Sequence, residues 1–157
     1  MSNLAHAGDD HPEAARKHAH DARVLLTAER YDGAAYLAGY AVECAVKALV
    51  LHDKTFDPAT GATDTAALAL WHRTLRTGYR HDLVRLLGLA LGARGARYAG
   101  FLPDPATTPP PDVARTWSET LRYRPAGEVT VERAASYVEW AGLAELAIAQ
   151  MTLDGVL

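Results

Sequence analysis

Two opposite charges stand one helical turn apart inside the most apolar stretch of the chain. Glu43 and Lys47 lie within residues 30–52, RYDGAAYLAGYAVECAVKALVLH, where small and aliphatic side chains dominate. Such a run is buried in a folded protein, and a buried charge is costly unless it is paired. With Glu on the N-terminal side at i, i+4, the two side chains can pair on one helix face. They form either a structural ion pair or part of a cleft that binds a ligand.

A second group of polar residues occupies residues 76–82, RTGYRHD. A histidine beside arginines can act as general acid or base on RNA, and the guanidinium groups can hold phosphate and stabilise its developing charge. Cleavage of RNA without a metal needs only a base, an acid and positive charge. Arg76 and His81 are the candidate catalytic pair, with Arg80 and Asp82 as ligand-binding neighbours. The alternative is that His81 and Asp82 only cap the next helix.

A third candidate segment, residues 117–124 with the sequence WSETLRYR, combines aromatic and basic side chains. Tyr123 stands between Arg122 and Arg124, an arrangement that can stack a base and bind phosphate. The alternative is that the aromatic side chains of this segment pack on the core. We take Arg122 and Tyr123 as candidate ligand-binding residues.

The remaining reactive side chains give no prediction of a metal or cofactor. Of the N-terminal histidines, His11 and His18 lie two turns apart and can share a face, but no carboxylate at helical spacing completes a metal site. Cys44 is the single cysteine and is expected to be buried and inert. No glycine-rich phosphate loop or zinc-binding motif occurs. We therefore predict no metal and no cofactor.

Length and composition indicate one helical domain spanning residues 1–157. At 157 residues the chain can bury a sizeable core without disulfides. Alanine is abundant and Ile148 is the only isoleucine, which favours helix over sheet. The net charge of −3 argues against a general polyanion binder. One segment is nevertheless locally basic, with Asp82 as its only acid; its arginines are Arg73, Arg76, Arg80, Arg85, Arg94 and Arg97.

Capping signals and apolar spacing predict the helices that position these residues. Residues 1–9 are expected to be flexible, and Asp10 starts a helix that ends near residue 29. Asp32 is expected to cap a central helix over about residues 33–52, followed by a loop to residue 63. Asp64 caps a short helix to about residue 76, which Gly78 ends. Further helices are expected over residues 81–91, 112–121 and 131–153, the last capped by Thr130, with an irregular region over 94–111.

The central helix is long enough to span a membrane, but its composition argues against this. Glu43 and Lys47 would be costly in the bilayer centre, and the helix ends lack aromatic or basic anchors. We therefore expect no membrane association. The single cysteine and the absence of a recognisable signal peptide fit a cytoplasmic location.

The central run, residues 30–51, resembles the second-helix signature of the HEPN family (higher eukaryotes and prokaryotes nucleotide-binding domain). Two further pieces agree in order: His81-Asp82-Leu83 with the following leucine pair, and residues 121–125, LRYRP, ahead of a long last helix. The resemblance implies an all-α, HEPN-like up-and-down bundle of four main helices plus short helices.

The resemblance also implies function and partners. It implies a homodimer and a small nucleotidyltransferase antitoxin as partner, in a toxin–antitoxin or defence module. Active members are metal-independent endoribonucleases with an Arg-x4–6-His motif, whose spacing Arg76 and His81 meet, although Thr77 stands where the family usually has another polar residue. Other members only bind nucleotide, RNA or a partner. Whether the chain is an enzyme stays open, with a non-catalytic helical scaffold as a further alternative.

Overall fold

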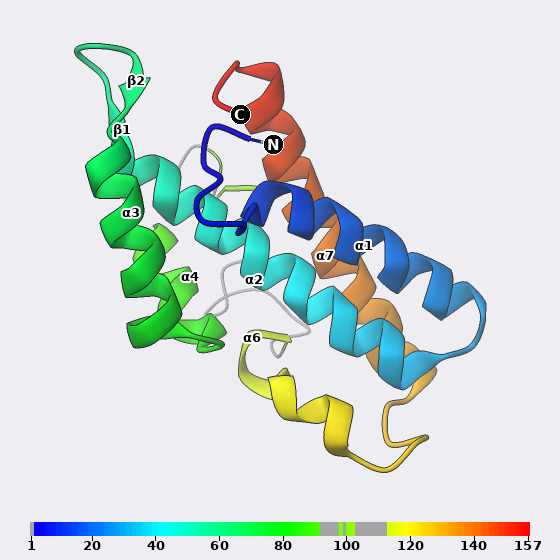
Figure 1. Cartoon of the computed structure of the whole chain (residues 1–157). Coiled ribbons are helices and arrows are strands. Elements are labelled where there is room, and N and C mark those ends of the chain that lie inside the picture. Colours follow the sequence, from blue (N-terminus) through cyan, green and yellow to red (C-terminus); the bar gives the residue numbers. More distant parts are fainter. Residues whose placement is uncertain (1, 92–97, 99, 103–112) are drawn as a thin grey trace.

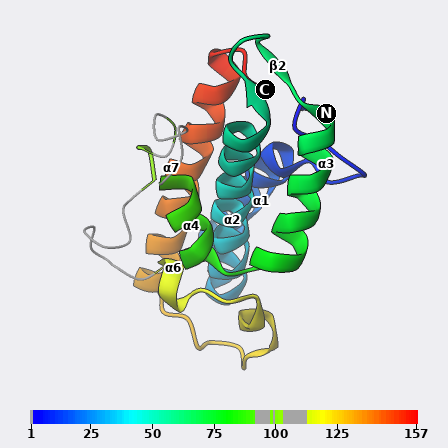
Figure 2. The same cartoon turned by 90° about the vertical axis from the view of Figure 1, so that its left-hand side faces the viewer.

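The computed structural model describes residues 2–91, 98, 100–102 and 113–157, and these form an all-α bundle. The helix α2 (Tyr31–Thr55) is its centre and packs mainly against α1 (His11–Thr27) and α7 (Val131–Leu153). Figure 1 shows α1 and α7 running alongside α2, while Figure 2 shows α2 between α7 and α3 (Thr65–Thr74). The predicted fold class is therefore confirmed.

The helix α1 begins where the capping signal predicts. The Asp10 carboxylate accepts a hydrogen bond from the backbone N–H of Glu13 at 3.3 Å, and Pro12 lies in the first turn. Its buried face consists mainly of small side chains, Ala15, Ala19 and Ala22. These let α1 lie close against α2.

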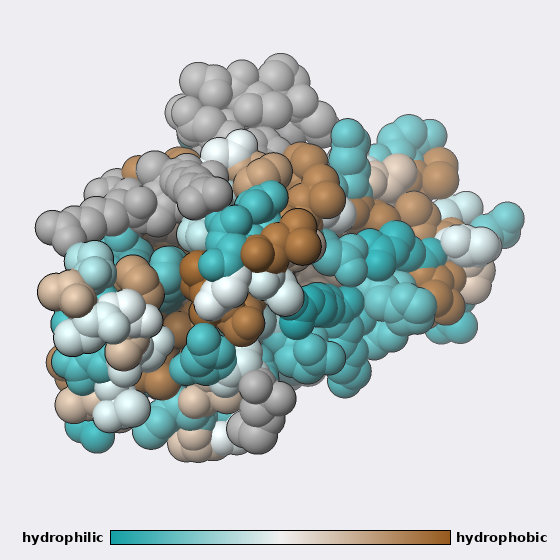
Figure 3. Space-filling view, turned by 90° about the horizontal axis from the view of Figure 1, so that it is seen from above, coloured by the Kyte–Doolittle hydropathy of each residue, from teal (hydrophilic) through white to brown (hydrophobic). Residues whose placement is uncertain are grey.

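The helix α2 is longer than the predicted 33–52, because it starts at Tyr31 and continues to Thr55. It meets the length and hydropathy of a membrane span, yet 83% of its apolar window is buried by the rest of the fold. A helix covered in this way is a core helix rather than a lipid-facing one. In Figure 3 hydrophilic and hydrophobic residues are intermingled over the face seen from above.

The prediction that Asp32 caps α2 was wrong. The residue before the helix is Arg30, which makes no side-chain cap. Asp32 lies in the first turn instead and accepts hydrogen bonds from the backbone N–H groups of Gly127 and Val129, at 2.6 and 2.9 Å. The carboxylate thus ties the turn before α7 to the start of α2. These backbone donors lower the pKa of Asp32 below its ordinary value.

The segment after α2 contains more regular structure than the predicted loop. A short antiparallel hairpin pairs β1 (Phe56–Asp57) with β2 (Ala62–Thr63). Asp64 then caps α3, as predicted, by accepting from the N–H groups of Ala66 and Ala67. The helix does not simply end at Gly78, because its last turn widens into a π-helical turn, η1 (Leu75–Tyr79), before α4 (Leu83–Leu91).

The chain before the last helix is less regular than predicted. In place of one helix over 112–121 there is α6 (Val113–Thr116), then a 3₁₀ turn, η2 (Glu119–Tyr123). Ser118 separates them in an extended conformation and caps η2. Thr130 caps α7 and the helix spans Val131–Leu153, as predicted. Most of the expected irregular region, 94–111, lies outside the described residues.

The N-terminal segment, expected to be flexible, makes defined contacts. Leu4 is fully buried, and Asp10 accepts hydrogen bonds from both the backbone N–H and the hydroxyl of Ser2. The segment crosses above the C-terminal half of α2 (Figure 1), which places it beside the candidate site.

Candidate functional site

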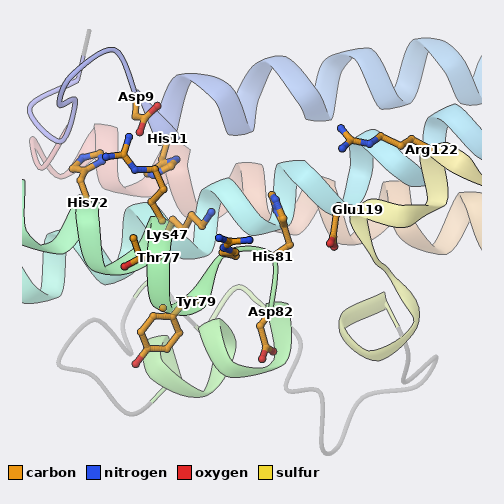
Figure 4. A pocket seen from close by; sticks show the side chains of 13 residues that line it. Asp9, His11, Lys47, His72, Thr77, Tyr79, His81, Asp82, Glu119 and Arg122 are labelled. Atoms are coloured by element: carbon orange, nitrogen blue, oxygen red, sulfur yellow. The ribbon is translucent and has the colours of Figure 1, made fainter.

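The candidate site follows one stripe of α2. Tyr36, Tyr40, Glu43 and Lys47 are spaced by four, three and four residues, so they share a helix face. A cleft of about 910 Å³ opens over the C-terminal part of this stripe, and we call it the His81 cleft. Figure 4 shows the side chains of Lys47, His81 and Arg122 following one another along it. The cleft therefore has a buried α2 floor.

Glu43 is the centre of a three-residue cluster. Its carboxylate accepts a hydrogen bond from Lys47 Nζ at 2.5 Å, and His81 Nδ1 lies 3.1 and 2.9 Å from its two oxygens. Glu43 is 1% exposed and Lys47 is 8% exposed, so the ion pair is almost completely shielded from solvent. Removing one partner from such a pair leaves a stranded charge, which costs far more than the pair itself contributes.

The contact with Glu43 fixes the orientation of the His81 ring. A carboxylate can only accept, so Nδ1 carries the proton and Nε2 is the acceptor in the neutral ring. Nε2 has no hydrogen-bond partner among the described residues, and the side chain is 36% exposed at the cleft. Tyr40 packs edge-on against the ring at 5.5 Å between centroids. This is the arrangement of a histidine oriented by a carboxylate to act as a base.

The end of η1 delivers His81 to this position. The backbone N–H of Arg80 donates to the carbonyl of Leu75 at 2.8 Å and closes the π turn. Arg80 then takes a φ of +37°, a conformation rare for a residue with a side chain. Asp82 caps α4 by accepting from the N–H of Arg85 at 3.0 Å. The chain is thus bent sharply between two helix ends, and His81 points back to α2.

Histidines line the cleft beyond Lys47. His72 is buried on α3 and lies 2.8 Å from the carbonyl oxygen of Leu4 through Nε2, which must therefore carry the proton. Its Nδ1 is buried without a partner among the described residues. His11 stacks on this ring at 5.3 Å, and His6 lies at 5.4 Å. Burial, then the charge of Lys47, lower the pKa of His11 to about 4, so the ring is neutral at neutral pH.

Arg122 stands at the other end of the His81 cleft. It comes from η2, its guanidinium donates to the Tyr36 hydroxyl at 3.4 Å, and it lies over the Tyr123 ring at 4.6 Å. The η2 segment is held against α2 by Trp117, whose indole N–H donates to the carbonyl of Tyr36 at 3.1 Å. Gly39 makes this approach possible, because a Cβ there would lie 2.0 Å from Trp117 Nε1.

Six of the eight sequence-predicted site residues line this cleft: Lys47, Arg76, Arg80, His81, Asp82 and Arg122. Glu43 does not line it but lies behind it, bonded to both Lys47 and His81. Tyr123 is 73% exposed and lies outside the lining, reached only through its contact with Arg122. Asp82 also caps α4, as the alternative interpretation expected. Arg122 contacts Tyr36 rather than Glu43 or Lys47.

Sequence reasoning missed the wall formed by α3 and the N-terminal segment. His72, Thr77 and Tyr79 line the cleft together with Asp9 and His11. His72 meets Leu4 from 68 residues away, and no local spacing signals such a contact. The spacing of His11 and His18 indicates only a shared helix face, and His18 lies beside Tyr40.

Neither a metal centre nor a thiol nucleophile is formed by the described residues. Within residues 2–91, 98, 100–102 and 113–157, no three side chains among His, Cys, Asp and Glu are arranged to hold a metal ion. Burial raises the pKa of the Cys44 thiol to about 12, which keeps it protonated and unreactive.

Comparison with curated proteins and with solved structures gave no match. The profile described as "HEPN domain" matches residues 9–142, which include α1, α2, the whole His81 cleft and the first half of α7. The match covers most of the chain and agrees with the helical architecture. The chain therefore belongs to the HEPN domain family, and its function is related to nucleotides or RNA.

Proposed function

We propose that the His81 cleft binds a phosphate-bearing ligand, either a nucleotide or RNA. The observation that carries the proposal is that Arg76 and Arg80 line the same cleft as His81 and Lys47. Neither guanidinium has a hydrogen bond or ion pair with any residue that the structure describes. Guanidinium groups left without a carboxylate at a concave site are suited to bidentate phosphate binding.

The cations of the cleft differ in what they can offer a ligand. Lys47 is neutralised by Glu43, so it contributes position more than charge. Arg122 lies at the opposite end, where its guanidinium contacts the Tyr36 hydroxyl at 3.4 Å and the Tyr123 ring, with no carboxylate partner among the described residues. Arg94 and Arg97, which belong to the same basic segment of sequence, lie outside the described residues.

A second candidate function, metal-independent RNA cleavage, is favoured by the contact between Glu43 and His81. In this scheme His81 Nε2 takes the proton of the 2′-hydroxyl, and Glu43 stabilises the imidazolium that forms. The 2′-oxygen then attacks phosphorus, the bond to the 5′-oxygen breaks, and a 2′,3′-cyclic phosphate results. Arg76 and Arg80 are placed to stabilise the charge that develops on phosphate. A proton returns to the leaving oxygen, from His81 or from a second copy in a dimer.

The biological setting is part of the proposal. We propose a homodimer with a small nucleotidyltransferase antitoxin as partner, in a toxin–antitoxin or defence module of the cytoplasm, as the resemblance of the central helix implies. The buried single cysteine is compatible with a reducing compartment. Co-purification with the product of a neighbouring nucleotidyltransferase gene tests the partner, and light scattering tests the dimer.

Binding is tested with a fluorescently labelled RNA oligomer by anisotropy at several salt concentrations. The variant R76A/R80A removes both unpaired guanidinium groups and should weaken binding at least tenfold. Losing two phosphate contacts should also reduce the slope of log K against log salt by about 1.4. The matched control is R73A, which removes an exposed arginine of α3 outside the cleft. Equal binding by all three proteins would reject the cleft as the site.

Cleavage is tested by incubating RNA with the purified protein in EDTA. The wild-type protein should produce fragments ending in a cyclic phosphate, and His81→Ala should abolish them. Circular dichroism must show that the variant is folded. Intact RNA with folded wild-type protein would reject catalysis and leave binding as the function.

A further inference from the structure

A second hollow lies beyond Arg122 and has not been assigned a role. It has a volume of about 520 Å³, lies over the N-terminal part of α2, and shares Arg122 with the His81 cleft. Its lining includes two further arginines, Arg30 and Arg124, and two tyrosines, Tyr31 and Tyr36. We call it the Arg30 hollow. Arginine beside aromatic rings is the lining of sites that hold single-stranded nucleic acid.

The two cavities form one path along the same stripe of α2. Tyr36 packs edge-on against Tyr40 at 5.0 Å, and Tyr40 packs against His81 at 5.5 Å, so contacting rings connect the hollow with the cleft, although Tyr40 lines neither. From Asp32 in the hollow to Lys47 in the cleft, the helix rises about 22 Å. That distance is the rise of about six stacked nucleotides in one strand. A single nucleotide would fill only one end of the path.

The Arg30 hollow is lined by two carboxylates, Glu29 and Asp32, besides its three arginines. Both oxygens of Asp32 are occupied by backbone N–H groups of Gly127 and Val129. Arg124 pairs with Glu128 at 2.8 Å, but both side chains are more than 40% exposed. Such a surface pair is weak and exchanges readily for another anion.

An exposed aromatic ring, that of Tyr123, contacts Arg122, the residue that the two cavities share, although the ring itself lines neither cavity. The Tyr123 side chain is 73% exposed, and the Arg122 guanidinium covers its ring at 4.6 Å. By contrast, the rings of Trp117 and Tyr137 are buried. A base stacked on this ring would have its phosphate beside Arg122 or Arg124.

We propose that the ligand of this protein is a single strand of RNA that runs from the His81 cleft over Arg122 into the Arg30 hollow. The inference rests on the proposed function of the His81 cleft and names its substrate class. The strand must be unpaired, because a tyrosine ring can stack only on a base whose face is not already covered within a duplex. The arginines hold the backbone, so base sequence has little effect on affinity.

The test compares oligomers of different length. Oligouridines of about two and about eight nucleotides with 2′-fluoro substitution serve as probes, because they cannot be cleaved through the 2′-oxygen, and the longer one spans the path. The longer oligomer should bind wild-type protein at least tenfold more tightly than the shorter one. R30A/R124A and Tyr123→Ala should each remove much of this difference while leaving the short oligomer unchanged. R73A is the control, and circular dichroism checks the fold.

The outcomes separate this inference from the proposed function. Equal affinity for both lengths, or an equal loss of both in R30A/R124A, would overturn the path while the His81 cleft keeps its role. Failure of both oligomers to bind would overturn RNA binding at the His81 cleft, the part of the proposed function on which the path rests. A duplex of the longer oligomer should compete at least tenfold less well than the single strand. Tighter binding of the duplex would contradict the role given to the tyrosines.

Discussion

The two ends of the path along α2 differ in how their charges are held. At the His81 cleft, Glu43 and Lys47 are buried and paired, and the carboxylate fixes the ring of His81. At the Arg30 hollow, the cations are exposed and their partners are hydroxyl groups or surface carboxylates. A buried, paired cluster keeps one geometry, which chemistry requires. Exposed arginine side chains can change conformation to follow a flexible strand, and such adaptable contacts are sufficient for binding.

The difference predicts that substitutions in the buried Glu43–Lys47 pair change stability, whereas substitutions of the exposed arginines change binding. Glu43→Gln should have the largest effect, because it leaves the Lys47 ammonium buried without an anion. We expect a loss of about 3–5 kcal/mol in the free energy of unfolding. Urea denaturation followed by circular dichroism measures it.

The control for that prediction removes both charges. Glu43→Gln combined with Lys47→Met leaves no stranded charge and should recover most of the lost stability. If the single and double variants are equally unstable, the pair is not what holds this part of the cleft. RNA cleavage by a folded double variant would then show whether His81 needs its carboxylate.

The histidine wall of the cleft should make stability depend on pH. The folded-state pKa of His11 is about 4, against 6.5 for an unperturbed histidine, so the unfolded chain takes up a proton that the folded chain refuses. The free energy of unfolding is therefore highest above pH 6.5. It falls by up to about 3 kcal/mol as the pH is lowered from 6.5 to 4. His11→Phe keeps an aromatic ring against His72 and should flatten this part of the curve. If the difference in unfolding free energy between the wild type and His11→Phe stays constant from pH 7 to 4, His11 is not the source of the pH dependence.

The contact that seats η2 can be broken on α2. Gly39→Ala places a Cβ against the Trp117 indole and should cost about 1–3 kcal/mol of unfolding free energy. The displaced η2 segment should also weaken binding of long oligomers. Gly88→Ala on α4 is the control, because a Cβ there meets nothing within 4 Å, and it should be neutral or stabilising by about 1 kcal/mol. Equal effects in both variants would mean that the approach of Trp117 is not limiting.

The smallest effect on stability is expected at the second end. Arg122→Ala removes an exposed side chain and should change the unfolding free energy by no more than about 0.5 kcal/mol. It should nevertheless weaken RNA binding several-fold, because Arg122 belongs to both cavities. Thermal unfolding and anisotropy on the same sample make the comparison. If Arg122→Ala lowers stability strongly but leaves RNA binding unchanged, Arg122 has a structural role and not the binding role given to it here.

Sequence reasoning predicted the elements with strong local signals. The caps at Asp10, Asp64 and Thr130 mark real helix starts, because each depends on a side chain and a backbone donor only a few residues apart. The Asp32 prediction failed because its carboxylate is used by a turn 95 residues away. The π turn at Leu75–Tyr79 was missed because propensity distinguishes only ordinary helix from a break.

The sequence by itself determined an all-α bundle around an apolar central helix, and it identified Glu43 and Lys47 as a pair, since both depend on spacing along the chain. Only the tertiary structure decided that His81 joins that pair, that His72 and His11 form the wall of the cleft, and that Arg122 links it to the Arg30 hollow. These contacts join segments 38 to 86 residues apart. They depend on how the helices pack and on the strained turn at Arg80, which local preferences do not encode.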